Sequence, residues 1–329
     1  MKRIAILTSG GDAPGMNACI RAVVHSAAAE GIEVLGVRRG YEGLMDGDME
    51  PMSSFDVFNI IQTGGSVLES SRSDEFKTSG GRKKAIGNLM ESGVEGLIVV
   101  GGDGSLRGAR SLAGESDVSV LGVPGTIDND LYGTDFSIGF DTATNFAVEA
   151  IDRVRDIART FERVFFVEVM GHHAGYLALH CAVAGGAEGV IIPEDPEDLD
   201  DLCASLEEGY RLSGKSAVVV VAETQDPGHS YEIAREVGAR TGFETRVCVL
   251  GYLQRGGRPT AGDRILGSKL GVAAVQALLA GVDGEMVGEI GNAIEYTSLE
   301  DACSRKKGLN QCLLELVQTF PPTGHAAEK

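Results

Sequence analysis

The sequence predicts an α/β fold with mainly parallel sheets, and three observations carry that prediction. Apolar, β-branched runs alternate with helical patterns along the chain, which is the order that strand–helix–strand units produce. Hydrophobic residues make up 43% of the chain but aromatic residues only 5%, so the core must be built from Val, Ile, Leu and Ala, as in buried parallel strands. The 46 glycines cluster, notably in loops after the apolar runs, where tight turns are needed.

Each predicted strand is a short run rich in Val, Ile and Leu, followed by a glycine-rich or polar loop. In chain order the pairs are 3–8 before "SGGDAPGMN", 96–100 before "GGDGS", 118–123 before "PGTIDND", 164–169 before "MGHHAG", 217–223 before "TQDPG" and 246–251 before "YLQRGGRPT". Helices are expected from about Met16, after "GGDGS", through Ala184 and through Leu279. Open α/β sheets bind ligands at the carboxyl ends of their strands, so we expect these loops to converge.

A longer amphipathic pattern covers residues 142–159 and predicts a helix that joins two lobes. The length of 329 residues suits one large domain or two of ordinary size. The polar tail after Phe320 is expected to be frayed.

The net charge of −19 argues against a nucleic-acid binder, because a phosphate backbone needs a basic face. It is compatible with small phosphorylated ligands, since a few local arginines suffice to hold them. The six cysteines are scattered and form no CxxC pair, which favours buried reduced thiols over disulfides or a zinc site. No apolar run is long enough to cross a membrane and no leader pattern begins the chain, so we expect a cytoplasmic protein without membrane partners.

Two glycine clusters after predicted strands suit phosphate binding. Gly10 and Gly11 let the backbone approach a phosphate at a helix start, although a tight strand-to-helix turn explains them about as well. In "GGDGS", the glycines clear space, Ser105 can donate to a phosphate, and Asp103 offers an oxygen ligand of the kind that Mg²⁺ prefers. A capped helix start is the alternative, but a second glycine cluster on another strand favours nucleotide phosphate.

The third loop, "PGTIDND" (124–130), carries two carboxylates spaced two residues apart. Phosphoryl transfer to an alcohol needs a base near the hydroxyl and a metal near the transferred phosphate. Asp128 and Asp130 could divide these two roles, whereas an Asx-turn would need only one of them.

Cationic residues accompany these loops: Arg72, Lys77, Arg82, Arg163, Arg246 and Arg255. A surface salt bridge explains any one of them, but together, bracketing one sheet edge, they favour a substrate that carries phosphate. The adjacent His172 and His173 point in different directions, so capping or substrate hydrogen bonding is favoured over metal binding. His180 and Cys181 on the following helix are assigned to the core or its flank.

Taken together, the motifs resemble those of one family, the bacterial ATP-dependent 6-phosphofructokinases (phosphofructokinase A family). The similar blocks occur in order, to about residue 320: "LTSGGDAPGMNA", "GGDGS", "PGTIDND", "EAIDRVRD", "VEVMG", "AVAGG", "ETRVCVLGYLQRGG" and "DRILG". This ordered set makes the resemblance specific. "GGDG" alone also resembles lipid and NAD kinases, which the blocks after residue 124 disfavour.

The resemblance implies two Rossmann-like lobes with the active site in the cleft between them. A larger ATP-binding lobe would use residues 1–138 and 251–305, and a smaller sugar-phosphate lobe residues 139–250 and 306–320, with 321–329 as a frayed tail. It further implies the glycolytic transfer of the γ-phosphoryl of ATP to the 1-hydroxyl of fructose 6-phosphate, giving fructose 1,6-bisphosphate and ADP, with Mg²⁺ as cofactor.

The resemblance also assigns roles by matching position, with Asp128 as the general base and Thr126, Gly11 and Arg72 as further catalytic residues. ATP would be held by Gly11, Arg72, Ser73, Gly102, Asp103, Gly104 and Ser105, and Mg²⁺ by Asp103, with Asp130 supporting it through water. Fructose 6-phosphate would be held by Thr126, Ile127, Asp128, Arg163, Met170, Gly171, His172, Glu223, Arg246, Tyr252, Leu253, Gln254 and Arg255. A neighbouring subunit would donate Arg163 and Arg246, so a homodimer or homotetramer is implied.

Two glycines bear on the phosphoryl donor. Similar enzymes that use pyrophosphate carry Asp in place of Gly104, where it would fill the space of the ATP α-phosphate, and Lys in place of Gly125, where it would clamp pyrophosphate. Glycine at both positions favours ATP. The alternatives are a pyrophosphate-dependent or other sugar-phosphate kinase of the same fold, and an inactive phosphosugar- or nucleotide-binding regulator. The joint presence of Asp103, Asp128 and Asp130 argues against the regulator.

Other positions depart from the family pattern. His172 stands where Arg is usual, so we expect a weaker or pH-dependent contact to the reacting phosphate. Tyr252 stands where His is usual; its phenol can still donate to a phosphate, but we expect the affinity for fructose 6-phosphate to change. Of the basic effector cluster in regulated bacterial enzymes, two positions are kept and two are replaced: Arg21 and Arg155 remain, and His25 and Ser54 stand at the others. We therefore expect weak or absent control by ADP and phosphoenolpyruvate.

Overall fold

The computed structural model of the chain describes residues 1–172, 174–195, 199–213, 216–224 and 228–319. Within these ranges strands alternate with helices and pair mostly in parallel, which confirms the α/β prediction. His173 and the tail 321–329, on which the sequence made predictions, lie outside the described residues.

The chain forms two compact units. The larger takes in Met1–Thr142 and Arg255–Lys307, and the smaller takes in Ala143–Gln254 and the chain from Gly308 on. The borders suggested by the sequence were 138/139, 250/251 and 305/306. Which ligand each unit holds stays a prediction.

The larger unit is built on a seven-stranded sheet in the order β11-β10-β5-β4-β1-β2-β3. Each of its two edge strands pairs antiparallel with its neighbour, β3 with β2 and β11 with β10. The pairings between the other strands are parallel. The strands are β1 (Arg3–Ser9), β2 (Glu33–Val37), β3 (Met49–Met52), β4 (Gly96–Gly101), β5 (Ser119–Pro124), β10 (Glu285–Ile290) and β11 (Ala293–Ser298).

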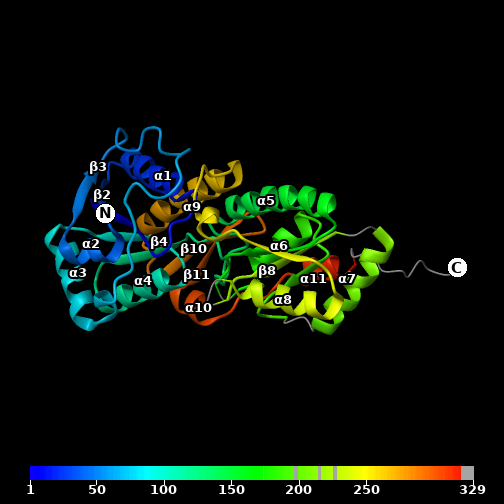
Figure 1. Cartoon of the computed structure of the whole chain (residues 1–329). Helices are drawn as coiled ribbons and strands as arrows, with labels where there is room; N and C mark the ends of the chain where they lie inside the picture. Colours follow the sequence, from blue (N-terminus) through cyan, green and yellow to red (C-terminus); the bar gives the residue numbers. More distant parts are fainter. Residues whose placement is uncertain (173, 196–198, 214–215, 225–227, 320–329) are drawn as a thin grey trace. The chain divides into compact units, whose positions relative to one another are not determined.

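Helices cover this sheet, among them α1 and α9, which lie side by side in Figure 1. They approach closely because α9 presents glycines to α1: a Cβ on Gly271 would lie 2.7 Å from the Cys19 carbonyl oxygen, and one on Gly267 2.9 Å from that of Gly15. The helices of this unit are α1 (Met16–Ala29), α2 (Gly40–Asp46), η1 (Glu75–Lys77), α3 (Ser79–Glu91), α4 (Asp103–Glu115), α9 (Ala261–Leu279) and α10 (Leu299–Ser304).

The smaller unit has a four-stranded parallel sheet in the order β7-β8-β6-β9. Phe166 and Val219 of its strands pack against Leu202 and Ile233 of its helices. The strands are β6 (Val164–Val169), β7 (Gly189–Ile191), β8 (Ala217–Ala222) and β9 (Thr245–Val249). The remaining elements are α5 (Phe140–Phe161), α6 (Tyr176–Ala184), α7 (Leu199–Ser213), α8 (His229–Thr241), η2 (Gly251–Arg255) and α11 (Gln311–Thr319).

The helix expected over 142–159 is α5, and the chain passes from the larger to the smaller unit within its first turn. The sequence missed several strands, and two of them have a local reason. β3 ("MEPM") contains a proline and β11 ("AIEYTS") is largely exposed, because both are edge strands.

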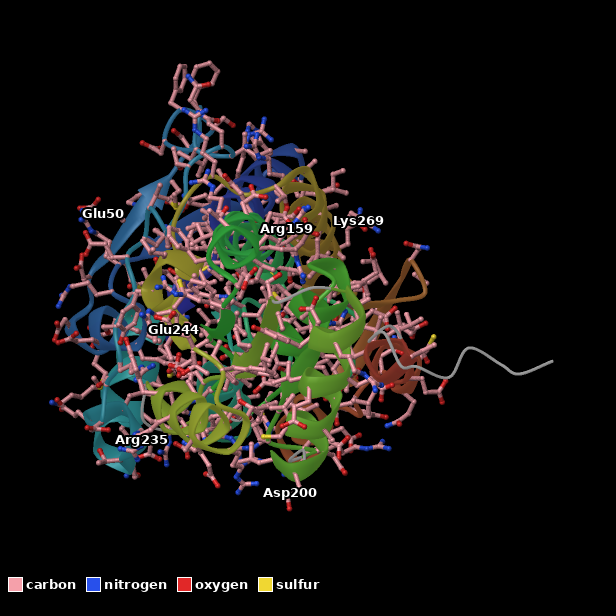
Figure 2. All side chains as sticks on the ribbon, turned by 45° about the vertical axis from the view of Figure 1, so that its right-hand side comes forward. Glu50, Arg159, Asp200, Arg235, Glu244 and Lys269 are labelled. Atoms are coloured by element: carbon pink, nitrogen blue, oxygen red, sulfur yellow. The ribbon has the colours of Figure 1, made fainter. Side chains whose placement is uncertain are left out.

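Charged side chains such as Glu50, Arg159 and Asp200 are exposed (Figure 2). The six cysteines are free thiols, of which Cys312 is exposed and Cys248 is partly exposed. None of the helices in the described ranges is both long and apolar enough to span a bilayer.

Candidate active site

The first three predicted loops meet at one edge of the larger sheet. Ser9, the last residue of β1, pairs in register with Gly101 of β4, and Gly101 pairs with Pro124 of β5. The backbone N–H of Gly125 donates to the Gly101 carbonyl oxygen at 3.0 Å. Loops that are far apart in sequence therefore leave three neighbouring strands at the same level, as the parallel topology requires.

A fourth segment joins this edge. The Ser70 hydroxyl donates to the Gly10 carbonyl oxygen at 2.5 Å, and the Gly10 N–H donates to the Ser71 carbonyl oxygen at 3.4 Å. Gly10 has a φ of 85°, a conformation that favours glycine. Arg72 and Ser73, both predicted to bind ATP, are thereby brought beside the first glycine loop, and Arg72 is exposed.

Arg255 lies against Gly11. A Cβ on Gly11 would lie 2.8 Å from Arg255 Cζ, and Arg255 Nη1 donates to the Asp12 carbonyl oxygen at 3.3 Å. The structure thus brings a predicted sugar-phosphate arginine onto a predicted ATP residue.

The "GGDGS" loop starts α4, with Asp103 in its first turn. Ser105 is buried against Gly101, Gly102 faces Thr126, and a Cβ on Gly104 would meet no atom within 4 Å. This last position has open space on the side where a nucleotide phosphate is predicted.

Arg107 forms an ion pair with the Asp103 carboxylate. Its Nε donates to both carboxylate oxygens, at 2.9 and 3.1 Å, and its Nη2 donates to the Cys303 carbonyl oxygen at 2.8 Å. Both side chains are about half exposed, so the pair is weak and an incoming cation can compete with it.

The two aspartates of "PGTIDND" lie in different surroundings because Asn129 between them has a φ of 53°. That conformation is held by Asn129 Oδ1, which accepts from the Ser137 N–H at 2.9 Å. Among the described residues no group donates to Asp128 Oδ1, although this oxygen is buried. A buried carboxylate oxygen without a donor is free to accept a proton.

The pKa of Asp130 depends on burial and on the neighbouring carboxylates. Its pKa is raised from 3.8 to about 6, first by burial and then by the negative charges of Asp128 and Asp103. Lys307 acts in the opposite direction on Asp130. The pKa of Lys307 is itself lowered to about 8 by burial, against the pull of Asp135 and Asp130.

Residues predicted to bind the sugar phosphate gather at the carboxyl edge of the smaller sheet. Val169 at the end of β6 pairs with Ala222 of β8, which places Met170 beside Glu223, whose N–H donates to the Val169 carbonyl oxygen at 2.8 Å. Gln254 is fully buried, and its Oε1 accepts from the Met170 N–H at 2.8 Å. Gly171 and His172 follow directly.

Three predicted contacts differ in what their side chains can reach. Tyr252 and Leu253 of η2 are 84% and 65% exposed in the single chain, so they are available to a ligand or a partner. Ile127 is fully buried, so its side chain belongs to the core and only its backbone can face a substrate.

The expectation that the arginines bracket one sheet edge is wrong for Arg163 and Arg246. Arg163 directly precedes β6, and Arg246 pairs in register with Phe165, so both lie at the amino ends of their strands. A strand of six residues puts them roughly 16 Å from the edge that carries Met170. The connectivity of a parallel sheet separates the two groups, although both adjoin strand termini in the sequence.

Some other candidates are explained by local contacts. Lys77 pairs with Asp74 at 2.8 Å and Arg82 with Glu115 at 2.8 Å, both ordinary surface ion pairs. Cys181 is buried on α6, and burial raises the pKa of its thiol.

Comparisons with known proteins identify the family. The family described as phosphofructokinase matches residues 3–278. The chain belongs to the phosphofructokinase family.

Relatives of the family match along nearly the whole chain. It is 54% identical over 320 residues to the ATP-dependent 6-phosphofructokinase 1 of Thermus thermophilus, with 97% of this chain and 99% of the relative covered. It is 47% identical over 326 residues to the ATP-dependent 6-phosphofructokinase of Halothermothrix orenii, with 96% and 98% covered.

Solved structures of the family share the fold. The phosphofructokinase of Pichia pastoris in the T-state matches with a TM-score of 0.88 and 34% identity, over 92% of this chain and 35% of that one, so this chain spans about a third of its length. The pyrophosphate-dependent phosphofructokinase of Marinobacter aquaeolei matches with a TM-score of 0.84 at 22% identity, over 98% and 92%, which shows the fold alone.

Within this phosphofructokinase fold the structure adds residues that the sequence did not single out. Tyr41 is buried, donates to the Ser105 carbonyl oxygen at 2.6 Å and stacks on Phe76 with ring centroids 3.9 Å apart. Arg107 and Lys307 adjoin the carboxylates. The spacing of Arg107 four residues after Asp103 on one helix was a usable signal, whereas Tyr41 and Lys307 reach the site only through tertiary folding.

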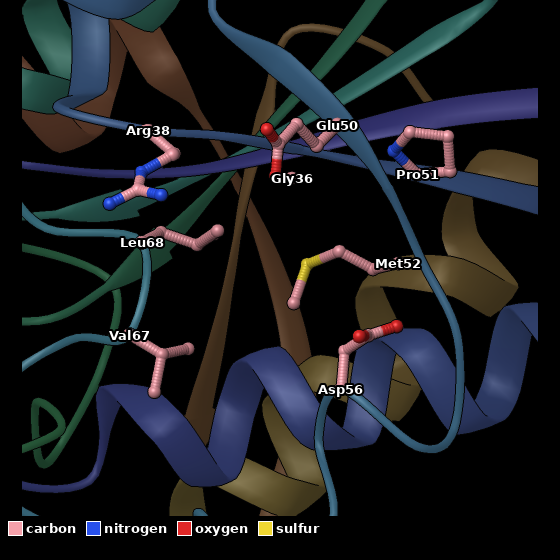
Figure 3. Close-up of a pocket in the computed structure, with 8 residues that line it drawn as sticks. All are labelled: Gly36, Arg38, Glu50, Pro51, Met52, Asp56, Val67 and Leu68. Atoms are coloured by element: carbon pink, nitrogen blue, oxygen red, sulfur yellow. The ribbon is translucent and has the colours of Figure 1, made fainter.

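One cavity of about 180 Å³ lies elsewhere in the larger unit, between β2, β3 and the residues that follow (Figure 3). Two of its polar side chains have partners: Arg38 pairs with Glu69 at 2.7 Å, and Asp56 accepts from the Ser53 N–H at 2.7 Å. The predicted site residues are not part of its lining.

Proposed function

We propose that this phosphofructokinase is ATP-dependent and transfers the γ-phosphoryl group of ATP to the 1-hydroxyl of fructose 6-phosphate. The observation that carries the proposal is the buried, donor-free Oδ1 of Asp128, set among two further carboxylates and at the level of both glycine loops. Identity of 54% to an enzyme named for this ATP-dependent reaction supports it. The reaction yields fructose 1,6-bisphosphate and ADP, a step of cytoplasmic glycolysis.

Asp128 is the general base. Its free oxygen takes the proton of the attacking hydroxyl, and the N–H of Asp128 donates to Thr126 Oγ1 at 3.2 Å, which orients this side chain beside the base. Thr126 also lies against Gly102, so it links the base loop to the phosphate loop.

Among the described residues no three His, Cys, Asp or Glu side chains are grouped so that they could hold a metal by themselves, so a magnesium ion here would need the phosphates of ATP as further ligands. Asp103 and Asp130 offer hard oxygen ligands, and the pKa of Asp130 is raised first by burial and then by the negative charges of Asp128 and Asp103. When bound with ATP, Mg²⁺ neutralises negative charge on the phosphates and so favours transfer. Asp103 would hold it directly and Asp130 would support it through water.

The ATP phosphates would lie along Gly11, Gly102, Gly104 and Ser105, with Arg72 and Ser73 on the segment that is hydrogen-bonded to Gly10. The open space beside Gly104 supports a triphosphate over pyrophosphate, because a side chain there would fill it. Gly125 is packed against Val100 and Met16, so the larger unit leaves little room for a side chain at that position.

Fructose 6-phosphate would be held by Met170, Gly171, His172 and Glu223, and by residues of η2 that include Arg255. Arg163 and Arg246 lie at the far end of their own sheet, so they would serve the site of a neighbouring subunit. The active enzyme is therefore a homo-oligomer, either a dimer or a tetramer.

A panel of donors against acceptors tests this function. ATP, GTP and pyrophosphate are each supplied with Mg²⁺ to fructose 6-phosphate and to sedoheptulose 7-phosphate, with and without ADP. We expect turnover to be highest with ATP and fructose 6-phosphate. Higher turnover with pyrophosphate would contradict the donor assignment, and no turnover with any pair would favour the binding-regulator alternative. A strong sigmoidal response relieved by ADP would contradict weak effector control.

A further inference from the structure

The chain segment Arg305–Lys307 contacts the loop that carries the proposed base and metal-side carboxylates. Lys306 pairs with Leu131 in an isolated antiparallel β-bridge, and the Arg305 guanidinium lies 4.1 Å from the centroid of the Tyr132 ring. Both contacts fall on the residues directly after Asp130. The segment follows α10 and ends where the larger unit ends.

Lys307 also contacts this loop, through its amino group. Its Nζ donates to the Asp135 carbonyl oxygen at 2.7 Å, and Asp135 also receives the Gly291 N–H at 2.7 Å through Oδ2. The same Asp135 carbonyl accepts from Asn129 Nδ2 at 3.1 Å. One carbonyl oxygen thus joins Lys307 to the residue whose left-handed backbone separates Asp128 from Asp130.

Lys307 also acts on this loop through its charge, which lowers the pKa of Asp130. Asp128 and Asp103 act on Asp130 as like charges, and Lys307 acts on Asp130 in the opposite direction. Neighbouring carboxylates repel one another, and this repulsion tends to push their loop apart unless a cation and fixed hydrogen bonds hold it.

We propose that Lys307 is a positioning residue for phosphoryl transfer, which holds the loop 128–135 so that Asp128 and Asp130 keep their separate directions. The proposal rests on the proposed function only for the identity of the reaction. Lys307 acts through the Asp135 carbonyl and through its charge, and it does not contact the reacting atoms.

The test compares Lys307→Met, which removes the charge and the donor, with Lys307→Arg, which keeps both. Lys83→Met is the matched control, because Lys83 is exposed on α3 of the same unit. The full-length enzyme is assayed with ATP, Mg²⁺ and fructose 6-phosphate, and hydrogen exchange of the amides in residues 129–136 is measured in parallel.

We expect Lys307→Met to lower kcat by about tenfold or more while the KM of each substrate stays within about threefold, because misplacement of a base affects turnover before binding. Its loop amides should exchange about tenfold faster, as expected when a local hydrogen-bonded unit is loosened. Lys307→Arg should recover most of kcat, and Lys83→Met should match the parent in both measurements.

A kcat for Lys307→Met within twofold of the parent, with unchanged exchange, would overturn the proposal. Should Lys307→Met fail to fold, Lys307→Arg decides: kcat near that of the parent supports the role of the charge, and a tenfold loss contradicts it. An inactive parent would sink the proposed function instead, and the exchange measurement would still report whether Lys307 holds the loop.

Discussion

The guanidinium group of Arg255 lies on the backbone of Gly11, although 243 residues separate Asp12, which accepts its hydrogen bond, from Arg255. The contact joins the first loop of the chain to the residue at which the chain re-enters the larger unit. It is possible only because residue 11 has no side chain. Glycine at this position therefore serves the arginine as well as any phosphate.

Gly11→Ala should displace Arg255 and leave the fold intact. The clashing atoms are the end of a flexible side chain and the Gly11 backbone is not left-handed, so we expect the free energy of unfolding to change by less than about 1 kcal/mol. The KM for fructose 6-phosphate should rise about tenfold or more, the effect of losing a charge-assisted hydrogen bond. Steady-state kinetics and urea unfolding measure the two quantities.

The matched comparison is made in an Arg255→Ala background. There the added methyl group meets no guanidinium, so Gly11→Ala should change the KM for fructose 6-phosphate by less than about twofold. Equal effects in both backgrounds would show that Gly11 and Arg255 act independently.

Gly104→Asp tests the donor assignment. The new side chain enters open space, so we expect little loss of stability but a fall in kcat/KM for ATP of about tenfold or more, through charge repulsion and lost room. Gly114→Asp is the control, because Gly114 also lies on α4 with no neighbour within 4 Å of an added Cβ. Unchanged ATP kinetics in Gly104→Asp would contradict the argument. Gly125→Lys is the less clear variant, since a Cβ there lies 3.0 Å from Val100 Cγ1.

Asp263 should make stability fall as pH rises through the weakly acidic range. Its buried carboxylate accepts from the N–H groups of Gly139 and Thr142, at 2.7 and 2.8 Å, at the start of α5. Burial raises its pKa from 3.8 to about 6, although these hydrogen bonds oppose the rise. The folded chain therefore holds this proton more tightly than the unfolded chain, so its stabilising effect is full below pH 4 and is lost by about pH 6.

Asp263→Asn should remove that contribution. Urea unfolding at pH 4, 5 and 6 should show a decline in unfolding free energy that is smaller than the parent's by about 2 kcal/mol. Asp117→Asn, at an exposed carboxylate, should keep the parental decline. The same decline in all three proteins would show that Asp263 does not titrate with folding.

Co-expression of two inactive variants tests the shared site. Asp128→Asn removes the proposed base, and Arg246→Ala removes an arginine that lies at the far edge of its own sheet. If Arg246 serves the neighbouring subunit, mixed oligomers contain one intact site, and activity should return to about a quarter of the parental value for equal mixing into dimers. Recovery no greater than the sum of the separate variants would assign Arg246 to its own chain.

Much of the fold was readable from local patterns. The run 164–169 is β6 without change, α1 begins at Met16, and the helix through Leu279 is α9. These elements are predictable because buried parallel strands and long helices impose strong periodicity on the sequence. β10 and β11 were missed, since strands that are partly exposed carry a weaker apolar signal.

The candidate site, like the fold, was predictable from the sequence only in part. The sequence by itself determined the family and predicted which loops carry chemistry, because glycines and carboxylates after strands form short, ordered motifs. Only the tertiary structure decided that Arg255 lies on Gly11, that the charge of Lys307 acts on Asp130, and that Arg163 and Arg246 lie at the far end of their sheet. Local sequence records what a loop can do, whereas strand order and chain crossings decide which distant side chains reach it.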